Sequence, residues 1–330
     1  MKRVTIYDVA NHAGVSLATV SRVINGSDVV RGNTRQKVEK AIEKLGYKPN
    51  AIAQGLALQK TTTIALVIPE ASFTYTGQII NGLLDVAKID KYNVMLHTTT
   101  EGIGEIGDII ENIIKSRVDG VIIYNDRMTQ SEINELSKYN IPIVIIGNRI
   151  SDKKISSVFV DTEHAVYELV RDTLARGIQD IAVLEDRKNN NATLLMIKGA
   201  TRAFEESGLL FNGFITIPEE CRTTYKFMAQ YLKEHHHDMI LANRDSQAFA
   251  VVNAATENKI VIPQEMEVVC VLDTKYNSMV RPEISSFAIP SYDLGSVSMR
   301  VMTKMLNNEE EENGKEIELS YLYTPRQSTK

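Results

Sequence analysis

Residues 17 to 25 carry side chains whose chemistry suits the edges of DNA base pairs. The guanidinium group of Arg22 can donate two hydrogen bonds to guanine, and Leu17 and Ala18 can make apolar contacts with thymine methyl groups. Asn25 can donate a hydrogen bond to a phosphate oxygen, a contact that positions a protein on DNA without reading its sequence. This combination predicts a helix that enters the major groove.

A first short helix must support this surface. Thr5 and Asp8 form a capping pattern, so the helix is expected to begin at Ile6, and Gly14 can adopt the left-handed conformation that ends it. Hydroxyl groups near the surface suit further phosphate contacts. The residues expected to supply these contacts are Thr5, Tyr7, Ser16, Thr19 and Ser21.

The surface itself belongs to a second helix, which a third helix backs. Ser16 is a favourable N-cap for the second helix. The residues of that helix that face inward are Val20, Val23 and Ile24. A third helix is expected from about Thr34 to Leu45, with Gly46 as its stop. Together these elements predict a three-helix head with a helix-turn-helix.

Charge separates the two ends of the chain. Residues 1–60 hold ten Lys and Arg against four Asp and Glu, a net charge of +6, whereas the remaining 270 residues hold 27 and 38, a net charge of −11. A basic head on an acidic body is typical of a nucleic-acid-binding domain joined to another module. The alternative is a three-helix core that has no role in DNA binding.

The stretch from Val4 to Thr63 resembles the DNA-binding head of the LacI/GalR family of bacterial transcription regulators, and the resemblance continues to the last residue. The motifs that carry it are Thr5-Ile-Tyr-Asp-Val-Ala, Val15-Ser, Ala18-Thr-Val-Ser-Arg-Val-Ile-Asn-Gly, Leu45-Gly-Tyr-Lys-Pro-Asn, Gly55-Leu56, Lys91-Tyr-Asn, Ser278-Met-Val-Arg-Pro and Arg326-Gln-Ser-Thr-Lys330. The resemblance implies a homodimeric regulator, mainly a repressor, that reads a pseudo-palindromic operator in carbon-source control and is not an enzyme.

The family also implies a hinge helix between Asn50 and Leu58. Pro49 bars continuation from the third helix, and a helix of two turns is too short to be stable alone. The resemblance implies that Asn50 contacts DNA and that Leu56 enters the minor groove as an apolar wedge. Gln54 departs from the family, which often has a basic residue there.

Short apolar runs that alternate with helical stretches indicate parallel sheets covered on both faces. The expected strands are residues 64–68, 94–97, 121–124, 143–146, 181–184, 239–241, 268–271 and 285–289. The fold class is therefore α/β, and the resemblance refines the core to two periplasmic-binding-protein-like lobes. We expect a head at 1–49, a hinge and linker at 50–61, and a core at 62–330, with crossovers between the lobes near 161 and 290.

The chain is expected to be cytoplasmic. No apolar segment precedes Met1-Lys2-Arg3, and no apolar run reaches membrane-spanning length. Two cysteines are too few for a disulfide framework and fit a reducing compartment. Cys270 lies in an expected strand and is assigned to the core.

Family members usually hold a small-molecule effector between the lobes, and several of those positions differ here. The positions expected at the cleft are Phe73, Tyr75, Asp161, Met196, Asp245 and Asp273. Met196 stands where the family commonly has an arginine, and the loss of a bidentate donor removes a strong contact. We therefore expect weak or absent sugar binding, with a retuned cleft for a small molecule as the alternative.

The resemblance also offers a protein effector, a serine-phosphorylated phosphocarrier protein that acts as corepressor. The residues it implies are Tyr292, Asp293, Val297, Arg300, Val301 and Lys304. Arg300 and Lys304 lie four residues apart and share one helix face, where a planar fork and a point charge suit a phosphoserine. The alternative is a solvated cationic face.

Three further patterns point to other classes of protein. Gly102, Gly104 and Gly107 spell a dinucleotide-binding motif, but the strand-to-helix spacing is wrong for it. Residues 235–237 are three histidines, which as neighbours on a helix point apart and form no single metal site. Residues 309–312 are an acidic run expected in a surface loop. We expect no cofactor, metal or catalytic grouping.

Overall fold

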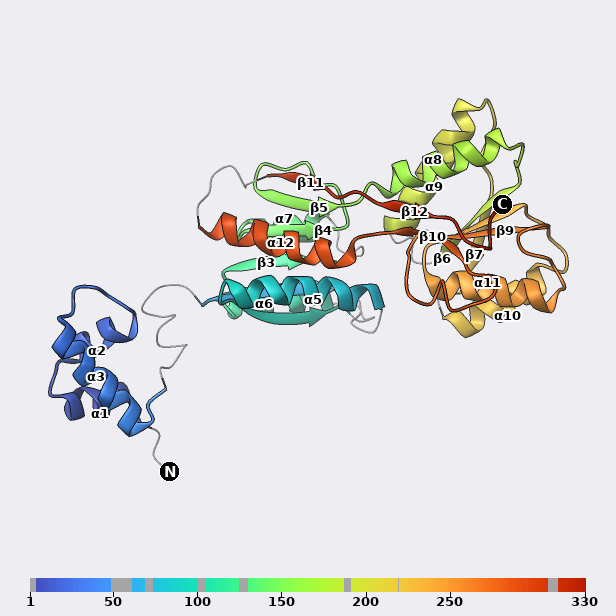
Figure 1. Cartoon of the computed structure of the whole chain (residues 1–330). Coiled ribbons are helices and arrows are strands. Elements are labelled where there is room, and N and C mark those ends of the chain that lie inside the picture. Colours follow the sequence, from blue (N-terminus) through green and yellow to red (C-terminus); the bar gives the residue numbers. More distant parts are fainter. Residues whose placement is uncertain are drawn as a thin grey trace. The chain divides into compact units, whose positions relative to one another are not determined.

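The computed structural model describes residues 4–48, 61–68, 74–99, 105–124, 130–186, 191–218, 220–307 and 314–330. The chain divides into two compact units, Met1–Thr62 and Thr63–Lys330, which we call the head and the core unit (Figure 1). Within the described residues, no helix is long and apolar enough to span a membrane.

Three helices form the head, namely α1 (Ile6–Ala13), α2 (Leu17–Ile24) and α3 (Gly32–Leu45). They enclose a small apolar core around Val9, Val20 and Val38, all of which are fully buried. The sequence predicted all three helices, but α3 begins two residues earlier than expected. Its N-cap position, Arg31, makes no side-chain capping bond, so no capping residue marks that end in the sequence.

The first half of the core unit builds most of one lobe, the N-lobe. Its parallel sheet has the order β11-β5-β4-β3-β1-β2. The strands are β1 (Thr63–Ile68), β2 (Asn93–Thr98), β3 (Gly120–Ile123), β4 (Ile143–Ile146), β5 (Ile155–Phe159) and β11 (Glu316–Glu318). The helices are α5 (Thr74–Ile89), α6 (Glu105–Lys115), α7 (Gln130–Ser137) and α12 (Ser291–Leu306).

Alternate residues of the N-lobe strands feed two separate apolar layers. Ile64 and Leu66 of β1 pack with residues of α5 and α12, whereas Ala65 and Val67 pack with residues of α6 and α7. Burial on both faces explains why these strands are continuous apolar runs in the sequence.

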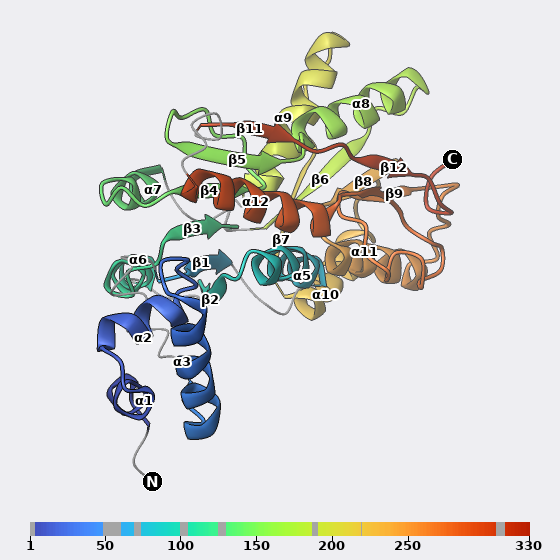
Figure 2. The same cartoon turned by 60° about the vertical axis from the view of Figure 1, so that its left-hand side comes forward.

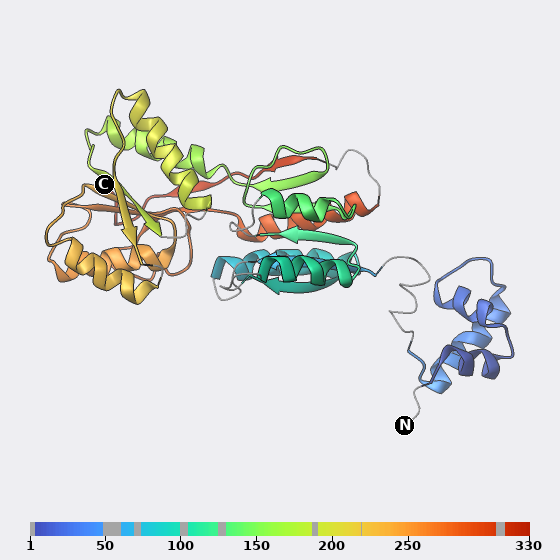
Figure 3. The same ribbon diagram turned by 180° about the vertical axis from the view of Figure 1, so that it is seen from behind.

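The second lobe, the C-lobe, repeats this plan (Figures 2 and 3). Its sheet has the order β12-β10-β9-β8-β6-β7 and is parallel except for β12, which runs antiparallel to β10. The strands are β6 (Ile181–Asp186), β7 (Phe214–Ile217), β8 (Met239–Ala242), β9 (Glu267–Cys270), β10 (Ser285–Ala288) and β12 (Leu322–Thr324). The helices are α8 (Thr162–Ala175), α9 (Asn191–Glu206), α10 (Cys221–Tyr231) and α11 (Asp245–Glu257).

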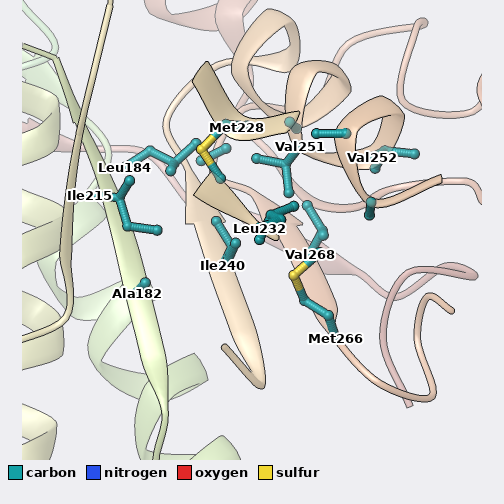
Figure 4. Close-up of a cluster of buried hydrophobic side chains, with 14 of the residues drawn as sticks. Ala182, Leu184, Ile215, Met228, Leu232, Ile240, Val251, Val252, Met266 and Val268 are labelled. Atoms are coloured by element: carbon teal, nitrogen blue, oxygen red, sulfur yellow. The ribbon is translucent and has the colours of Figure 1, made fainter. Parts of the chain in front are cut away.

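Two helix pairs cover the faces of the C-lobe sheet. The α8–α9 pair packs on one face, and the α10–α11 pair covers the other, where Met228 and Val251 meet Ile240 and Val268 of the strands (Figure 4). Cys270 of β9 is fully buried, as expected, and burial raises the pKa of its thiol to about 12. The α/β class with two parallel-sheet lobes is therefore confirmed.

The chain passes between the lobes at three places, after Phe159, after Ala288 and after Glu318. The third passage follows from the two short strands β11 and β12, which lie in different sheets. Neither strand could be expected from the sequence, since each has only three residues.

The last five residues are bound into the C-lobe. The hydroxyl of Ser328 is buried and donates to the carbonyl of Val268, and its amide donates to Glu283 over 2.9 Å. Glu267, which is 1% exposed, accepts two hydrogen bonds of 2.9 and 2.8 Å from Arg176 and one from the amide of Lys330. The end of the chain therefore ties β9 to the segment before β10 and to α8.

Two glycines allow α5 and α12 to cross with their backbones in contact. A Cβ atom at Gly295 would lie 1.9 Å from the carbonyl oxygen of Ile79, and one at Gly82 would lie 2.0 Å from the carbonyl oxygen of Tyr292. Neither contact is possible for a residue with a side chain, because backbone atoms cannot give way as a flexible side chain can. Each glycine is thus required by the partner helix.

We predict that Gly295→Ala lowers the free energy of unfolding by about 1–3 kcal/mol, because the new methyl group forces the helices apart. Gly77→Ala on α5 is the matched control, since a Cβ atom there meets no described atom within 4 Å. Alanine favours a helix over glycine by up to about 1 kcal/mol, so the control should be slightly stabilised. Urea denaturation followed by circular dichroism measures both, and equal stability of Gly295→Ala and wild type would contradict the prediction.

Candidate nucleic-acid interface

The exposed side of α2 presents the side chains that the sequence assigned to base contacts. Leu17 is 38% exposed, and Ala18, Arg22 and Asn25 are also exposed, whereas Val20 is fully buried beneath them. The helix therefore offers a cationic group and apolar groups together on the side away from the head's core. This arrangement can reach into a groove and meet both polar and methyl groups there.

Hydrogen bonds at both ends of the turn fix the start of α2. Gly14 adopts the left-handed conformation, with φ of 66°, and its amide donates to the carbonyl of Ala10. Ser16 then caps α2 by accepting the amide of Thr19 over 3.2 Å, and the two hydroxyls lie 2.8 Å apart. Leu17 and Ala18 lie between Ser16 and Thr19 in the chain, so these hydrogen bonds hold their backbone in place.

The start of α1 is capped as the sequence predicted. The carboxylate of Asp8 accepts the amide of Thr5 over 2.8 Å and its hydroxyl over 2.7 Å, and the Thr5 hydroxyl accepts the amide of Asp8. Tyr7 lies within this box, between Thr5 and Asp8, and is 65% exposed. The phenol is thus free of the head's core, at a position where the sequence assigned it to a phosphate.

The loop between α2 and α3 is held by a contact that sequence reasoning missed. The guanidinium of Arg35 donates to the carbonyl of Ser27 over 2.8 Å, across eight residues of chain. From the sequence, an arginine in a basic head is expected to bind a phosphate. No sequence signal distinguishes that role from the loop-positioning role that Arg35 has here. Of the other assigned DNA contacts, Ser21 is half-buried, and Asn50 and Leu56 lie outside the described residues.

Two aspartates assigned to the effector cleft already accept hydrogen bonds from the protein. Asp161 caps α8 by accepting the amide of His164 over 2.9 Å. Asp245 accepts the amide of Ser246 over 2.6 Å and the hydroxyl of Thr274 over 2.8 Å. Each carboxylate therefore accepts hydrogen bonds at the start of a helix and contributes to the local structure there.

Asp273 is bound even more fully. It accepts a hydrogen bond from Arg326 over 3.0 Å, within a half-buried ion pair, and one from the hydroxyl of Ser286 over 2.8 Å. Met196 lies in the apolar layer between α8–α9 and the sheet and is fully buried. It is part of the core in this structure rather than an open cleft wall. Sequence reasoning missed Arg326, because the pair is separated by 53 residues.

Two contacts lie where the lobes approach each other. The rings of Tyr75 and Tyr124 meet edge to face with centroids 6.1 Å apart. Asn191, the first residue of α9, donates from its amide to the side-chain oxygen of Asn148, which follows β4. The second contact joins the two lobes directly. Phe73 lies outside the described residues.

A polar surface runs along α12 and contains most of the residues assigned to the protein effector. Asp293, Arg300 and Lys304 are exposed and follow one another at helical spacing. Tyr292 is 42% exposed and donates from its hydroxyl to Asp85 of α5 over 2.9 Å. This hydrogen bond raises the pKa of the Tyr292 phenol above its ordinary value.

The two valines assigned to the same surface differ. Val297 is partly exposed, but Val301 is only 3% exposed and packs in the layer between α12 and the N-lobe sheet. Val301 therefore offers no surface to a partner, contrary to the expectation. The sequence spacing placed it beside Arg300, but adjacent helix residues differ by 100°, and this step turns Val301 toward the sheet.

The glycine motif and the three histidines that the sequence singled out are found in ordinary structural positions where the structure describes them. The third glycine of the dinucleotide-like motif, Gly107, lies inside α6, and the other two lie outside the described residues. The three histidines lie in the loop after α10 and not on a helix, contrary to the expectation. The rings of His235 and His237 both stack with Tyr231, and His237 also hydrogen-bonds to Asp180 over 2.7 Å. In the described part of the chain, no three acidic, cysteine or histidine residues are grouped to hold a metal ion.

Comparison with known families matches both units. Residues 5–50 match the model for bacterial regulatory proteins of the lacI family, and residues 170–329 match a periplasmic binding protein-like domain. The chain is 34% identical to catabolite control protein A of Priestia megaterium over 99% of each chain. It is 35% identical to that of Staphylococcus xylosus, over 93% of this chain and 94% of the relative.

A solved structure has the same fold throughout. The lac repressor dimer bound to operator and the anti-inducer ONPF superposes with a TM-score of 0.87, covering 99% of both chains at 24% identity. The likeness therefore extends over head and core alike.

Proposed function

Because the chain belongs to the LacI family of bacterial regulatory proteins, whose members are DNA-binding transcription regulators and not enzymes, we propose that it acts mainly as a repressor of genes for carbon-source use. Its similarity to catabolite control protein A supports this choice of genes. Its place of action would be the cytoplasm, where the operator DNA is found.

The observation that carries the proposal is the exposed face of α2. Leu17, Ala18 and Arg22 would reach base edges in the major groove, while Asn25 and the hydroxyls near both helix starts would contact phosphates. The charge of +6 on residues 1–60 adds a sequence-independent attraction to DNA. Recognition would thus combine a general basic surface with a small base-reading face.

Two copies would bind together, so that two α2 helices read the halves of a pseudo-palindrome. Regulators of this family bind operators as dimers, as the lac repressor structure illustrates. Exposed apolar side chains support a protein interface on each lobe. On the N-lobe, Leu84 and Ile89 of α5 are 42% and 76% exposed, and on the C-lobe, Tyr276 and Met279 are 38% and 68% exposed.

The proposal assigns a separate role to each of three parts of the chain. Residues 1–49 would bind the major groove, residues 50–61 would form the hinge, and residues 62–330 would dimerise and receive the signal. In the hinge, Asn50 would contact the DNA and Leu56 would enter the minor groove. Signal and DNA binding would be coupled through the pairing of two hinges.

A serine-phosphorylated phosphocarrier protein would act as corepressor on the α12 surface. Arg300 and Lys304 would hold the phosphate, with Tyr292, Asp293 and Val297 contacting the partner around it. The exposure of both cationic groups on one face of a well-packed helix supports this role, because a phosphoserine accepts several charge-assisted hydrogen bonds.

The alternative is control by a small molecule between the lobes. The hydrogen bond from Asn191 to Asn148 favours it, because a contact that joins the lobes is sensitive to a ligand between them. A sugar is less favoured as the ligand, because Asp245 and Asp273 already accept hydrogen bonds from within the protein. A ligand that sought their oxygens would compete with hydrogen bonds from the protein itself.

The first prediction concerns base reading. Arg22→Ala should weaken operator binding by about 1–3 kcal/mol and affect random DNA little, because the lost contact is specific to a base. Fluorescence anisotropy at one fixed salt concentration measures both. Lys37→Ala on α3 is the charge-matched control and should weaken both DNAs alike. An unchanged ratio of operator to random binding in Arg22→Ala would contradict the role of Arg22.

The second prediction concerns the corepressor. Arg300→Ala and Lys304→Ala should each weaken binding of the serine-phosphorylated phosphocarrier protein by about ten- to a hundredfold, since a charge-assisted hydrogen bond contributes about 1.5–3 kcal/mol. Arg222→Ala, an exposed arginine of α10, is the control and should bind normally. Pull-down with the phosphorylated and unphosphorylated forms provides the measurement. Equal retention in every arm would reject the surface.

The third prediction concerns the cleft. Titration calorimetry with a panel of sugar phosphates should show no micromolar ligand, because the carboxylates that could accept sugar hydroxyls are already bonded. A micromolar ligand would instead establish the alternative mode of control.

A further inference from the structure

The end of α2 is closed by hydrogen bonds that include the backbone of Arg22. The amide of Ser27 donates to the carbonyl of Arg22 over 2.9 Å, and the amide of Gly26 donates to the carbonyl of Val23 over 3.1 Å. Gly26 has the left-handed conformation, with φ of 75°. This is the Schellman motif, in which the residues after a helix bind the carbonyls of its last turn. The position of Arg22 is therefore coupled to that of Ser27.

Ser27 is in turn bound by α3. Its carbonyl accepts a hydrogen bond from the guanidinium of Arg35 over 2.8 Å. Ser27 thus accepts from Arg35 through its carbonyl and donates to Arg22 through its amide. Two consecutive hydrogen bonds therefore connect α3 to the residue that the proposed function assigns to guanine.

Arg35 lies where a helix usually disfavours a cation. It is the fourth residue of α3, and the amides at the start of a helix carry partial positive charge, which favours acidic side chains. The guanidinium is half-buried, whereas Lys37 and Lys40 of the same helix are exposed. The carbonyl of Ser27 offsets this unfavourable position, because it offers an acceptor to the cation.

α2 needs such support at both ends. It has only eight residues, and a helix of that length is not stable alone. Ser16 holds its first turn, and the loop through Ser27 holds its last turn. A bidentate contact with guanine requires both donors to be aligned, so a small shift of the last turn is enough to weaken it.

We propose that Arg35 is a positioning residue for base recognition, which sets the place of Arg22 by holding Ser27 against α3. The proposal rests on the base-reading role of Arg22 given above and extends it to a residue that acts through the head and not on the DNA. The opposing role for Arg35 is that of a phosphate ligand. Loss of a phosphate ligand weakens binding to all DNA about equally, whereas loss of a positioning residue lowers the preference for the operator over random DNA.

The test uses the full chain and two fluorescein-labelled duplexes, one that the wild type selects from a random pool and one with a scrambled sequence. The ratio of the two dissociation constants is the preference. Arg35→Met keeps the apolar stem and removes the donor, and it should lower the preference by about three- to tenfold. The loss should be smaller than in Arg22→Ala, because the base contact is weakened and not removed. Lys37→Met removes the same charge from an exposed position of α3 and should keep the wild-type preference.

Hydrogen exchange shows whether the head stays folded. In Arg35→Met, the amide of Ser27 should exchange faster, while the amides of α1 should stay protected. If α1 loses protection as well, Arg35→Lys replaces Arg35→Met in every comparison. Its side chain keeps the charge and is one bond shorter, so a positioning role predicts a lowered preference and a phosphate role predicts the wild-type preference.

The double variant Arg22→Ala/Arg35→Met tests whether Arg35 acts through Arg22. Its preference should equal that of Arg22→Ala within about twofold, because two residues that act through one contact are not additive. The proposal is overturned if Arg35→Met and Lys37→Met have the same preference, or if the two single losses multiply in the double variant. An unchanged preference in Arg22→Ala would instead reject the base-reading role itself, so the two failures can be told apart.

Discussion

Backbone contact between α5 and α12 is the constraint on which the N-lobe depends. The lobe is assembled from distant parts of the chain, since α12 begins more than 200 residues after α5. Gly82 and Gly295 let the two backbones touch, and this close approach sets how α12 lies on the sheet. It turns Met299 and Met302 inward and leaves Arg300 and Lys304 outside. The proposed corepressor surface is therefore a product of helix packing as much as of charge.

Much of this architecture could be predicted from the sequence, because its signals are local. Capping residues and a stop glycine define α1 and α2, and continuous apolar runs define the central strands. Four strands, β5, β7, β11 and β12, escaped prediction because they lack a continuous apolar run. β5 carries two buried serines, β7 is buried only at alternate residues, and β11 and β12 are held mainly by their neighbours in the sheet. Their existence depends on distant chain segments, which a local pattern cannot reveal.

The same difference between local signals and long-range contacts decides which parts of the candidate sites could be predicted. The exposure of the α2 face could be predicted because one helix supplies all of it. The cleft could not, since Asp273 looks like a free carboxylate until Arg326 is brought beside it by the fold. Val301 looked like a surface residue for the same reason, because only the packing of α12 on the sheet decides which side of the helix is covered. Charge and type indicate what a residue can do, and long-range packing decides whether it is available.

The binding of the last five residues into the C-lobe has a consequence for how the protein is made. α12, β11, β12 and the tail all come from the final 40 residues, and each lobe needs some of them. During synthesis, the head, which is a compact unit formed by the first 62 residues, can fold early. Neither lobe can complete its sheet until these late segments have emerged from the ribosome. The DNA-binding part can thus fold before the parts that would control it are complete.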